Sequence, residues 1–112
     1  MTGFSSVYIT VSHETDEATR IAKNLVASNL AACVNILSPM TSIYRWEGAL
    51  CEDREVAVLV KTRAELVDQV IERVRELHSY SCPCIVAWPI VAGNPDYLEW
   101  LGSETGASNT PK

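Results

Sequence analysis

The sequence predicts a single α+β domain in which strand, helix, strand, strand, helix and strand follow one another. Two segments, residues 14–29 and 62–77, carry apolar side chains every three or four positions, which is the period of an amphipathic helix. The segments around them alternate or form short runs of β-branched residues, as strands do. A chain of 112 residues with 47% apolar content can build one such core.

The first half of the chain supplies a strand and a helix. Residues 4–11 alternate and are rich in β-branched and aromatic types, so we expect a strand there. The apolar stripe of the following helix comprises Ala18, Ile21, Ala22, Leu25, Val26 and Asn29. Acidic residues Glu14, Asp16 and Glu17 in its first turn favour the helix start.

A long bent hairpin is predicted for the centre of the chain. The apolar run 31–37 is interrupted by Ser38-Pro39 and resumes at residues 41–46, which suggests one strand bent at a proline bulge. Glu47-Gly48 offers the turn, and residues 55–61 form the returning strand with apolar side chains on both faces.

The second helix is expected to start at a capping box. In Thr62-Arg63-Ala64-Glu65, the threonine and glutamate have the spacing that satisfies free amides at a helix start. The helix continues to Leu77, with Leu66, Val67, Val70, Ile71 and Val74 in its buried stripe.

The C-terminal part supplies a fourth strand over residues 82–91 and a short helix over 95–101 that begins with a proline. The ordered core is expected to span about residues 4–102, and the small residues of 103–112 predict a flexible tail. The element order is the split βαβ arrangement of ferredoxin-like folds.

A lone subunit of this architecture would expose apolar surface. Both helices cover one face of the sheet, yet the other face is also apolar, with Ile36, Leu37, Tyr44 and Trp46 on the hairpin. We therefore expect a symmetric oligomer, most simply a trimer.

Charge and composition exclude several partners. The formal net charge of −5 disfavours nucleic acid and anionic lipid surfaces. The longest apolar stretch, residues 84–92, is far shorter than the roughly 20 residues that span a bilayer. Residues 1–6 lack the pattern of a secretory signal, so we expect a cytoplasmic protein with reduced thiols.

Several motifs resemble the CutA divalent-cation-tolerance family. They are Leu30-Ala31-Ala32-Cys33-Val34-Asn35-Ile36, Ser42-Ile43-Tyr44-Arg45-Trp46-Glu47-Gly48, Lys61-Thr62 after Glu55, His78-x-Tyr80-x-x-Pro83, and Gly93-Asn94 before Tyr97-Leu98-x-Trp100. The resemblance covers residues 7–101 and implies a trimer of ferredoxin-like subunits. It also implies tolerance to copper and other divalent cations, with family-typical residues near the clefts between subunits.

One stretch departs from the family pattern. The usual His-Pro-Tyr-Glu-x-Pro-Glu is replaced here by His78-Ser79-Tyr80-Ser81-Cys82-Pro83-Cys84, which lacks both carboxylates. A binding role of those acids is therefore lost, or sulfur has replaced oxygen as the ligand.

The candidate metal ligands are Cys33, His78, Cys82 and Cys84. Cys82 and Cys84 lie two positions apart on the expected strand, so both thiolates could face a soft ion such as Cu(I) or Zn(II). Burial as small apolar residues is the competing interpretation of the cysteines, and capping of a helix C-terminus is that of His78. Cys51 is expected to be an incidental exposed thiol, and His13 an exposed residue without a partner.

A second candidate site is a cleft between subunits. It would be lined by Tyr44, Trp46, Glu55, Lys61 and Tyr80, and it would suit a small anionic or amphipathic ligand. Aromatic packing at an interface is the alternative explanation.

The sequence thus leaves two functions open. The first is a trimer that binds soft or divalent metal ions such as copper, with no required cofactor. The second is a trimeric signalling or scaffold protein with a cleft for a ligand or protein partner. An enzyme is not predicted. The loop of residues 12–16 is acidic and lacks the glycines that would cradle phosphate, and no nucleophile–base pair follows from the spacing.

Overall fold

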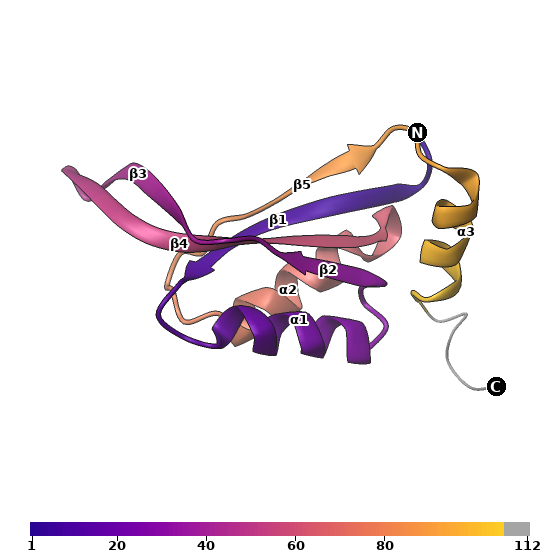
Figure 1. The fold of residues 1–112 in the computed structure, drawn as a ribbon, viewed down its shortest axis with the longest axis horizontal. Helices are drawn as coiled ribbons and strands as arrows, with labels where there is room; N and C mark the ends of the chain where they lie inside the picture. The colour runs from indigo at the N-terminus through magenta and orange to yellow at the C-terminus, as the bar shows by residue number, and fades with distance from the viewer. Residues whose placement is uncertain (107–112) are drawn as a thin grey trace.

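The computed structural model describes residues 1–106, in the order of elements that the sequence predicts (Figure 1). The strands are β1 (Phe4–Ser12), β2 (Cys33–Ile36), β3 (Met40–Trp46), β4 (Ala49–Arg63) and β5 (Ile85–Ile90). The helices are α1 (Glu17–Ala27), α2 (Val67–Leu77) and α3 (Pro95–Ser103), and a short 3-10 turn, Ala64–Leu66, precedes α2.

The strands form one antiparallel sheet in the order β2-β4-β1-β5, with β3 paired to the outer half of β4. Strand β1 is central and pairs along its whole length with β4, from Phe4 opposite Arg63 to Ser12 opposite Glu55. This register places the end of β1 beside the point where β4 continues into the projecting β3–β4 hairpin.

Helices α1 and α2 cover the same face of the sheet (Figure 1). Alternate residues of β1, namely Val7, Ile9 and Val11, point into this layer and are fully buried, because successive strand side chains face opposite sides. They pack against the apolar stripes of the two helices to form the core. The side chains between them, such as Tyr8 and Thr10, face the uncovered side of the sheet.

The predicted single bent strand is two strands. Strand β2 ends at Ile36 and β3 begins at Met40, and both pair with β4. Proline has no amide to donate to the ladder, so regular pairing stops around Pro39 rather than bending through it. The hairpin closes where Glu47 and Gly48 both have positive φ, 48° and 82°, as a two-residue type I′ turn requires.

The predicted capping box is wrong. Thr62 belongs to β4, and its hydroxyl donates to the carbonyl of Leu30 at 2.6 Å inside the protein. The helical segment begins two residues later, with no side-chain hydrogen bond to its first amides. The threonine is thus used to join the loop before β2 to the sheet.

The C-terminal boundaries also differ from those expected. Strand β5 starts at Ile85, so Cys82 and Cys84 lie in the connection before it. Helix α3 extends to Ser103, and Thr105 beyond it is fully buried. Arg63 donates from Nε to the Thr105 carbonyl at 3.2 Å and ties this end to β4. Of the predicted tail, residues 107–112 lie outside the described residues.

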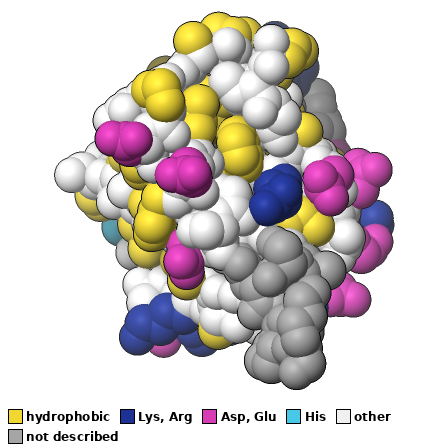
Figure 2. Space-filling model, turned by 90° about the vertical axis from the view of Figure 1, so that its right-hand side faces the viewer, with side chains coloured by type: hydrophobic (Ala, Val, Ile, Leu, Met, Phe, Trp, Pro, Cys, Tyr) yellow, Lys and Arg dark blue, Asp and Glu magenta, His cyan; other side chains and the backbone are white. Residues whose placement is uncertain are grey.

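Large apolar side chains stay exposed on the uncovered face and its ends. On β5, Val86 is 49% exposed and Trp88 is 46% exposed. Figure 2, which views the end that carries α3, shows apolar side chains gathered across the upper part of that end. Within residues 1–106, no helix combines the length and the apolar character needed to cross a lipid bilayer.

Candidate functional site

A cavity of about 770 Å³ opens where the β3–β4 hairpin leaves the sheet. We call it the hairpin cavity. Its floor comes from the uncovered face of β1, one wall from β3 and β4, and the other wall from the connection before β5. The lining residues are Tyr8, Thr10, Ser12, His13, Glu14, Ser42, Tyr44, Trp46, Asp53, Arg54, Glu55, Tyr80, Ser81, Cys82 and Cys84.

Two phenol–carboxylate pairs shape the hairpin cavity. The Tyr80 hydroxyl donates to Glu55 Oε2 at 3.1 Å, and the Tyr44 hydroxyl donates to Asp53 Oδ2. Burial and then the Glu55 hydrogen bond raise the pKa of Tyr80 to about 12. The hydrogen bond to Asp53 chiefly raises the pKa of Tyr44 to about 12. Both phenols therefore stay neutral donors at physiological pH.

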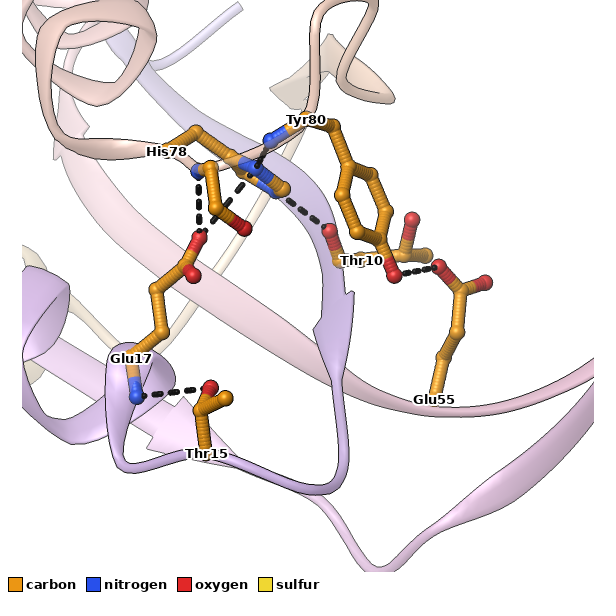
Figure 3. Close-up of polar contacts among 7 residues, drawn as sticks. Thr10, Thr15, Glu17, Glu55, His78 and Tyr80 are labelled. Atoms are coloured by element: carbon orange, nitrogen blue, oxygen red, sulfur yellow. Dashed lines mark hydrogen bonds and ion pairs between the residues drawn. The ribbon is translucent and has the colours of Figure 1, made fainter.

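His78 lies behind this wall and is held by the protein itself (Figure 3). Its Nε2 donates to the Thr10 carbonyl at 2.8 Å, because a carbonyl can only accept. Its Nδ1 lies 3.1 Å from the Tyr80 amide and 3.2 Å from Glu17 Oε2. With both ring nitrogens occupied, His78 positions Tyr80, whose ring centroid is 4.6 Å away.

Glu17 is a site residue that the sequence interpretation missed. It is 2% exposed, and its Oε2 accepts from the Ser79 amide at 2.8 Å, which fixes the segment that carries Tyr80 (Figure 3). The sequence places Glu17 in the first helical turn, where a carboxylate is explained by the helix dipole alone. One feature of the sequence could have indicated its burial: Glu17 lies one helical turn before Ile21, and so on the same face of the helix as this apolar residue.

Cys82 and Cys84 both line the hairpin cavity as free, exposed thiols. Partial burial raises the pKa of Cys84, against the lowering effect of a hydrogen bond with Thr10. Both cysteines precede β5, and neither side chain is in the core. The competing interpretation, in which they are buried as small apolar residues of a central strand, therefore does not apply.

Cys33 and Lys61 lie apart from the hairpin cavity. They are cross-strand partners on β2 and β4, and Lys61 Nζ donates to Asn35 Oδ1 at 2.8 Å. The same ammonium lies 5.9 Å from the centre of the Tyr97 ring. Burial and the neighbouring Cys33 raise the pKa of Tyr97. Of the five predicted cleft residues, Tyr44, Trp46, Glu55 and Tyr80 thus come together and Lys61 does not.

The four predicted metal ligands are likewise divided between places. Cys82 and Cys84 share the hairpin cavity, His78 is buried behind it, and Cys33 lies beside Lys61. Across the part of the chain that the structure describes, no three His, Cys, Asp or Glu side chains converge as a metal-binding group. His13 is exposed as expected, but it does have a partner, because its Nδ1 lies 3.1 Å from the Arg54 carbonyl. Cys51 lies within β4 and is half-buried, not exposed as predicted.

Comparison with known proteins supports one family. The family described as CutA1 divalent ion tolerance protein matches residues 5–104. The divalent-cation tolerance protein CutA of Thermus thermophilus is 52% identical over 100 residues, which are 89% of this chain and 96% of that protein. The CutA homolog of Xenopus laevis is 45% identical, but the matched region is only 64% of its length.

Solved structures agree with these sequence matches. The Thermus thermophilus divalent cation tolerance protein has a TM-score of 0.88 at 50% identity and covers 92% of this chain and 99% of its own. CutA1 from Oryza sativa has a TM-score of 0.89 at 39% identity and covers 96% of this chain and 100% of its own. In sequence and in fold, the chain belongs to the CutA1 divalent ion tolerance family.

Proposed function

We propose that this protein is a cytoplasmic, non-enzymatic homotrimer that binds a soft metal ion, with copper as the best candidate, in a metal-tolerance role. The observation that carries the proposal is the pair Cys82 and Cys84, two free thiols two positions apart on the rim of the hairpin cavity. The family description and the names of its relatives support the role in divalent-cation tolerance.

The donor set favours a soft ion of low coordination number. Thiolates prefer Cu(I) and Zn(II) over hard cations such as Mg²⁺. Two thiolates suffice for Cu(I), whereas a structural zinc site usually needs four ligands. His78 is engaged within the protein and Cys33 lies elsewhere, so we assign the ion to Cys82 and Cys84 alone.

The trimer is supported by the uncovered sheet face. A monomer rarely leaves so many large apolar side chains in water, and a symmetric partner would cover them. Relatives are described in other compartments: the Archaeoglobus fulgidus protein as periplasmic and the Oryza sativa relative as chloroplastic.

Native mass spectrometry of the reduced protein with one equivalent of Cu(I) per chain tests the ion site. We expect each chain to hold one copper ion, and the double variant Cys82→Ser/Cys84→Ser to lose it. The matched control is Cys33→Ser/Cys51→Ser, which removes as many thiols and should keep the copper. Copper retained by the first variant, or lost equally from both, would contradict the assignment.

The hairpin cavity itself favours a second candidate function, a signalling or scaffold trimer that binds a small ligand. Its volume lies within the range of roughly 300–1,000 Å³ that is typical of small-molecule sites. A trimer that ignores copper in the experiment above would favour this function. The chemistry of the cavity indicates the class of ligand.

A further inference from the structure

Glu55 is a buried acidic residue without a cationic partner among the residues that the structure describes. Its side chain lines the hairpin cavity, and the residue is only 7% exposed. The Tyr80 phenol donates to Oε2, but among residues 1–106 no lysine, arginine or histidine forms an ion pair with Glu55. A buried carboxylate is costly unless it is paired, and one neutral hydrogen bond compensates only part of that cost. The cavity therefore favours a cation.

The remaining lining gives this cation an aromatic and acidic surrounding. Four rings, from Tyr8, Tyr44, Trp46 and Tyr80, face the same space as the carboxylates of Glu14 and Asp53. Aromatic faces attract cations through their quadrupoles. The hydroxyls of Tyr44 and Tyr80 stay protonated and donate to carboxylates at neutral pH, since each of these two phenols has a pKa of about 12. Their oxygen lone pairs can still accept from an N–H donor.

The one permanent cation in the lining does not neutralise Glu55. Arg54 lies between Asp53 and Glu55 on β4 and contributes to the cavity lining. No ion pair joins Arg54 to either neighbour or to any other residue that the structure describes. His13, the remaining basic residue of the lining, is exposed and directs Nδ1 at a backbone carbonyl.

The number of converging ligands favours an organic cation over a bare metal ion. Hard divalent ions need several converging oxygen ligands, and in residues 1–106 no group of three such side chains converges. An ammonium group needs only a few acceptors and an apolar wall for its stem. We propose that the hairpin cavity binds an organic ammonium ligand of the diamine or polyamine class, with Glu55 as its principal anchor.

This inference rests on the second candidate function, the small-ligand trimer, and names its ligand. It uses the carboxylates and rings of the cavity, whereas the proposed copper site uses its two thiols. The two sites share a wall but no side chain, so each can fail without the other.

Calorimetric titration of the full-length, reduced protein with spermidine in chelator-treated buffer tests the proposal. We expect saturable binding, and no binding of fully acetylated spermidine, which has similar length but no charge. Glu55→Gln should weaken the affinity about tenfold, because a charge-assisted hydrogen bond is lost without a change of shape. The matched control is Glu52→Gln, which makes the same change at an exposed residue of β4 outside the cavity and should leave the affinity unchanged.

Two further variants keep the test decisive. Trp46→Leu alters a residue that is 47% exposed on the hairpin, so it should fold even if Glu55→Gln does not, and it should weaken spermidine binding several-fold. Cys33→Ser/Cys51→Ser, which changes two thiols outside the cavity, should bind spermidine as the unchanged protein does. Equal effects of Glu52→Gln and Glu55→Gln, binding of the acetylated compound, or no saturable binding would each overturn the proposal.

Discussion

Glu17 and His78 connect the start of helix α1 to the segment that follows α2. The carboxylate accepts from the Ser79 amide and approaches the imidazole, while the imidazole donates to the carbonyl of Thr10 on the central strand. The end of β1, the start of α1 and the segment after α2 thereby meet at one buried point. The position of Tyr80, and with it one wall of the hairpin cavity, depends on this connection.

Replacement of Glu17 by alanine should therefore destabilise the fold. The part-buried hydrogen bond from the Ser79 amide would be lost, which costs about 1 kcal/mol. Urea unfolding at a fixed protein concentration measures the change in the free energy of unfolding. Glu17→Gln retains an acceptor oxygen and should lose less, and the exposed Glu14→Ala should change stability by at most about 0.5 kcal/mol. If Glu17→Ala matched Glu14→Ala, the buried connection would have no structural role.

Tyr80 should ionise unusually late. Its pKa in the folded protein is about 12, above the ordinary value of 10.0, because burial and Glu55 both disfavour the phenolate. Because the folded protein holds the phenol proton more tightly than the unfolded chain, the shift contributes to the free energy of unfolding below pH 10. This contribution is lost as the pH rises through 12. Alkaline titration followed by tyrosinate absorbance should show a late step that Tyr80→Phe reduces, and ionisation of all tyrosines near the ordinary value would contradict the buried geometry.

At the scale of the element, the β3–β4 hairpin carries two of the four cavity aromatics and is held to the sheet only through β4. Its turn has a residue poorly suited to its conformation. Glu47 has a φ of 48°, a left-handed conformation that costs an L-residue roughly 1–2 kcal/mol unless, like asparagine, it tolerates this region well. Gly48, with a φ of 82°, already suits its position.

Glu47→Asn should accordingly stabilise the hairpin by about 0.5–1 kcal/mol, since Asn-Gly is the preferred type I′ pair. Gly48→Ala should destabilise it by about 1 kcal/mol. A Cβ atom at position 48 would meet nothing within 4 Å, so this loss reports on backbone conformation alone. Native-state hydrogen exchange of the β3 and β4 amides measures the local opening, and faster exchange in Glu47→Asn would contradict the turn assignment.

The elements show what the sequence could and could not predict. Helices α1 and α2 and strand β1 were predictable because their periodic apolar residues pack against one another. Thr62 was misassigned because a threonine three residues before a glutamate also fits a strand end whose hydroxyl bonds to a distant loop. The start of β5 was placed too early, because the apolar types of Cys82 and Cys84 do not reveal that the pairing with β1 begins only at Ile85.

The sequence predicted only part of the candidate site, because a sequence pattern does not show which residues meet in space. Of the residues predicted for a cleft between subunits, Tyr44, Trp46, Glu55 and Tyr80 line one cavity of this chain. Lys61 does not, because it lies six residues beyond Glu55 on β4. Residue type and the family pattern suggested a metal role for His78. Only the fold shows that Thr10 and Glu17 occupy its ring.

At the scale of the whole molecule, the two faces of the sheet differ in what covers them. Helices α1 and α2 cover one face, while the other leaves Val86 and Trp88 of β5 about half exposed. Burying apolar surface stabilises association by about 25 cal/mol per Å² before the entropic cost of assembly. Assembly of three chains should thus involve the β5 side of the uncovered face, whose Val86 and Trp88 are not part of the cavity lining.

Trp88→Glu should break the trimer, because it places a charge on a surface that assembly would remove from water. Val26→Glu is the matched control: Val26 is 42% exposed, against 46% for Trp88, but it lies on helix α1 on the opposite side of the sheet. Light scattering coupled to size-exclusion chromatography should give a trimer for the unchanged protein and for Val26→Glu, and a smaller species for Trp88→Glu. If Val26→Glu dissociated the protein and Trp88→Glu did not, assembly would use the helical face, and the cavity floor would stay open to solvent in the oligomer. A trimer in both variants would instead restrict the contact to the hairpin and the end that carries α3.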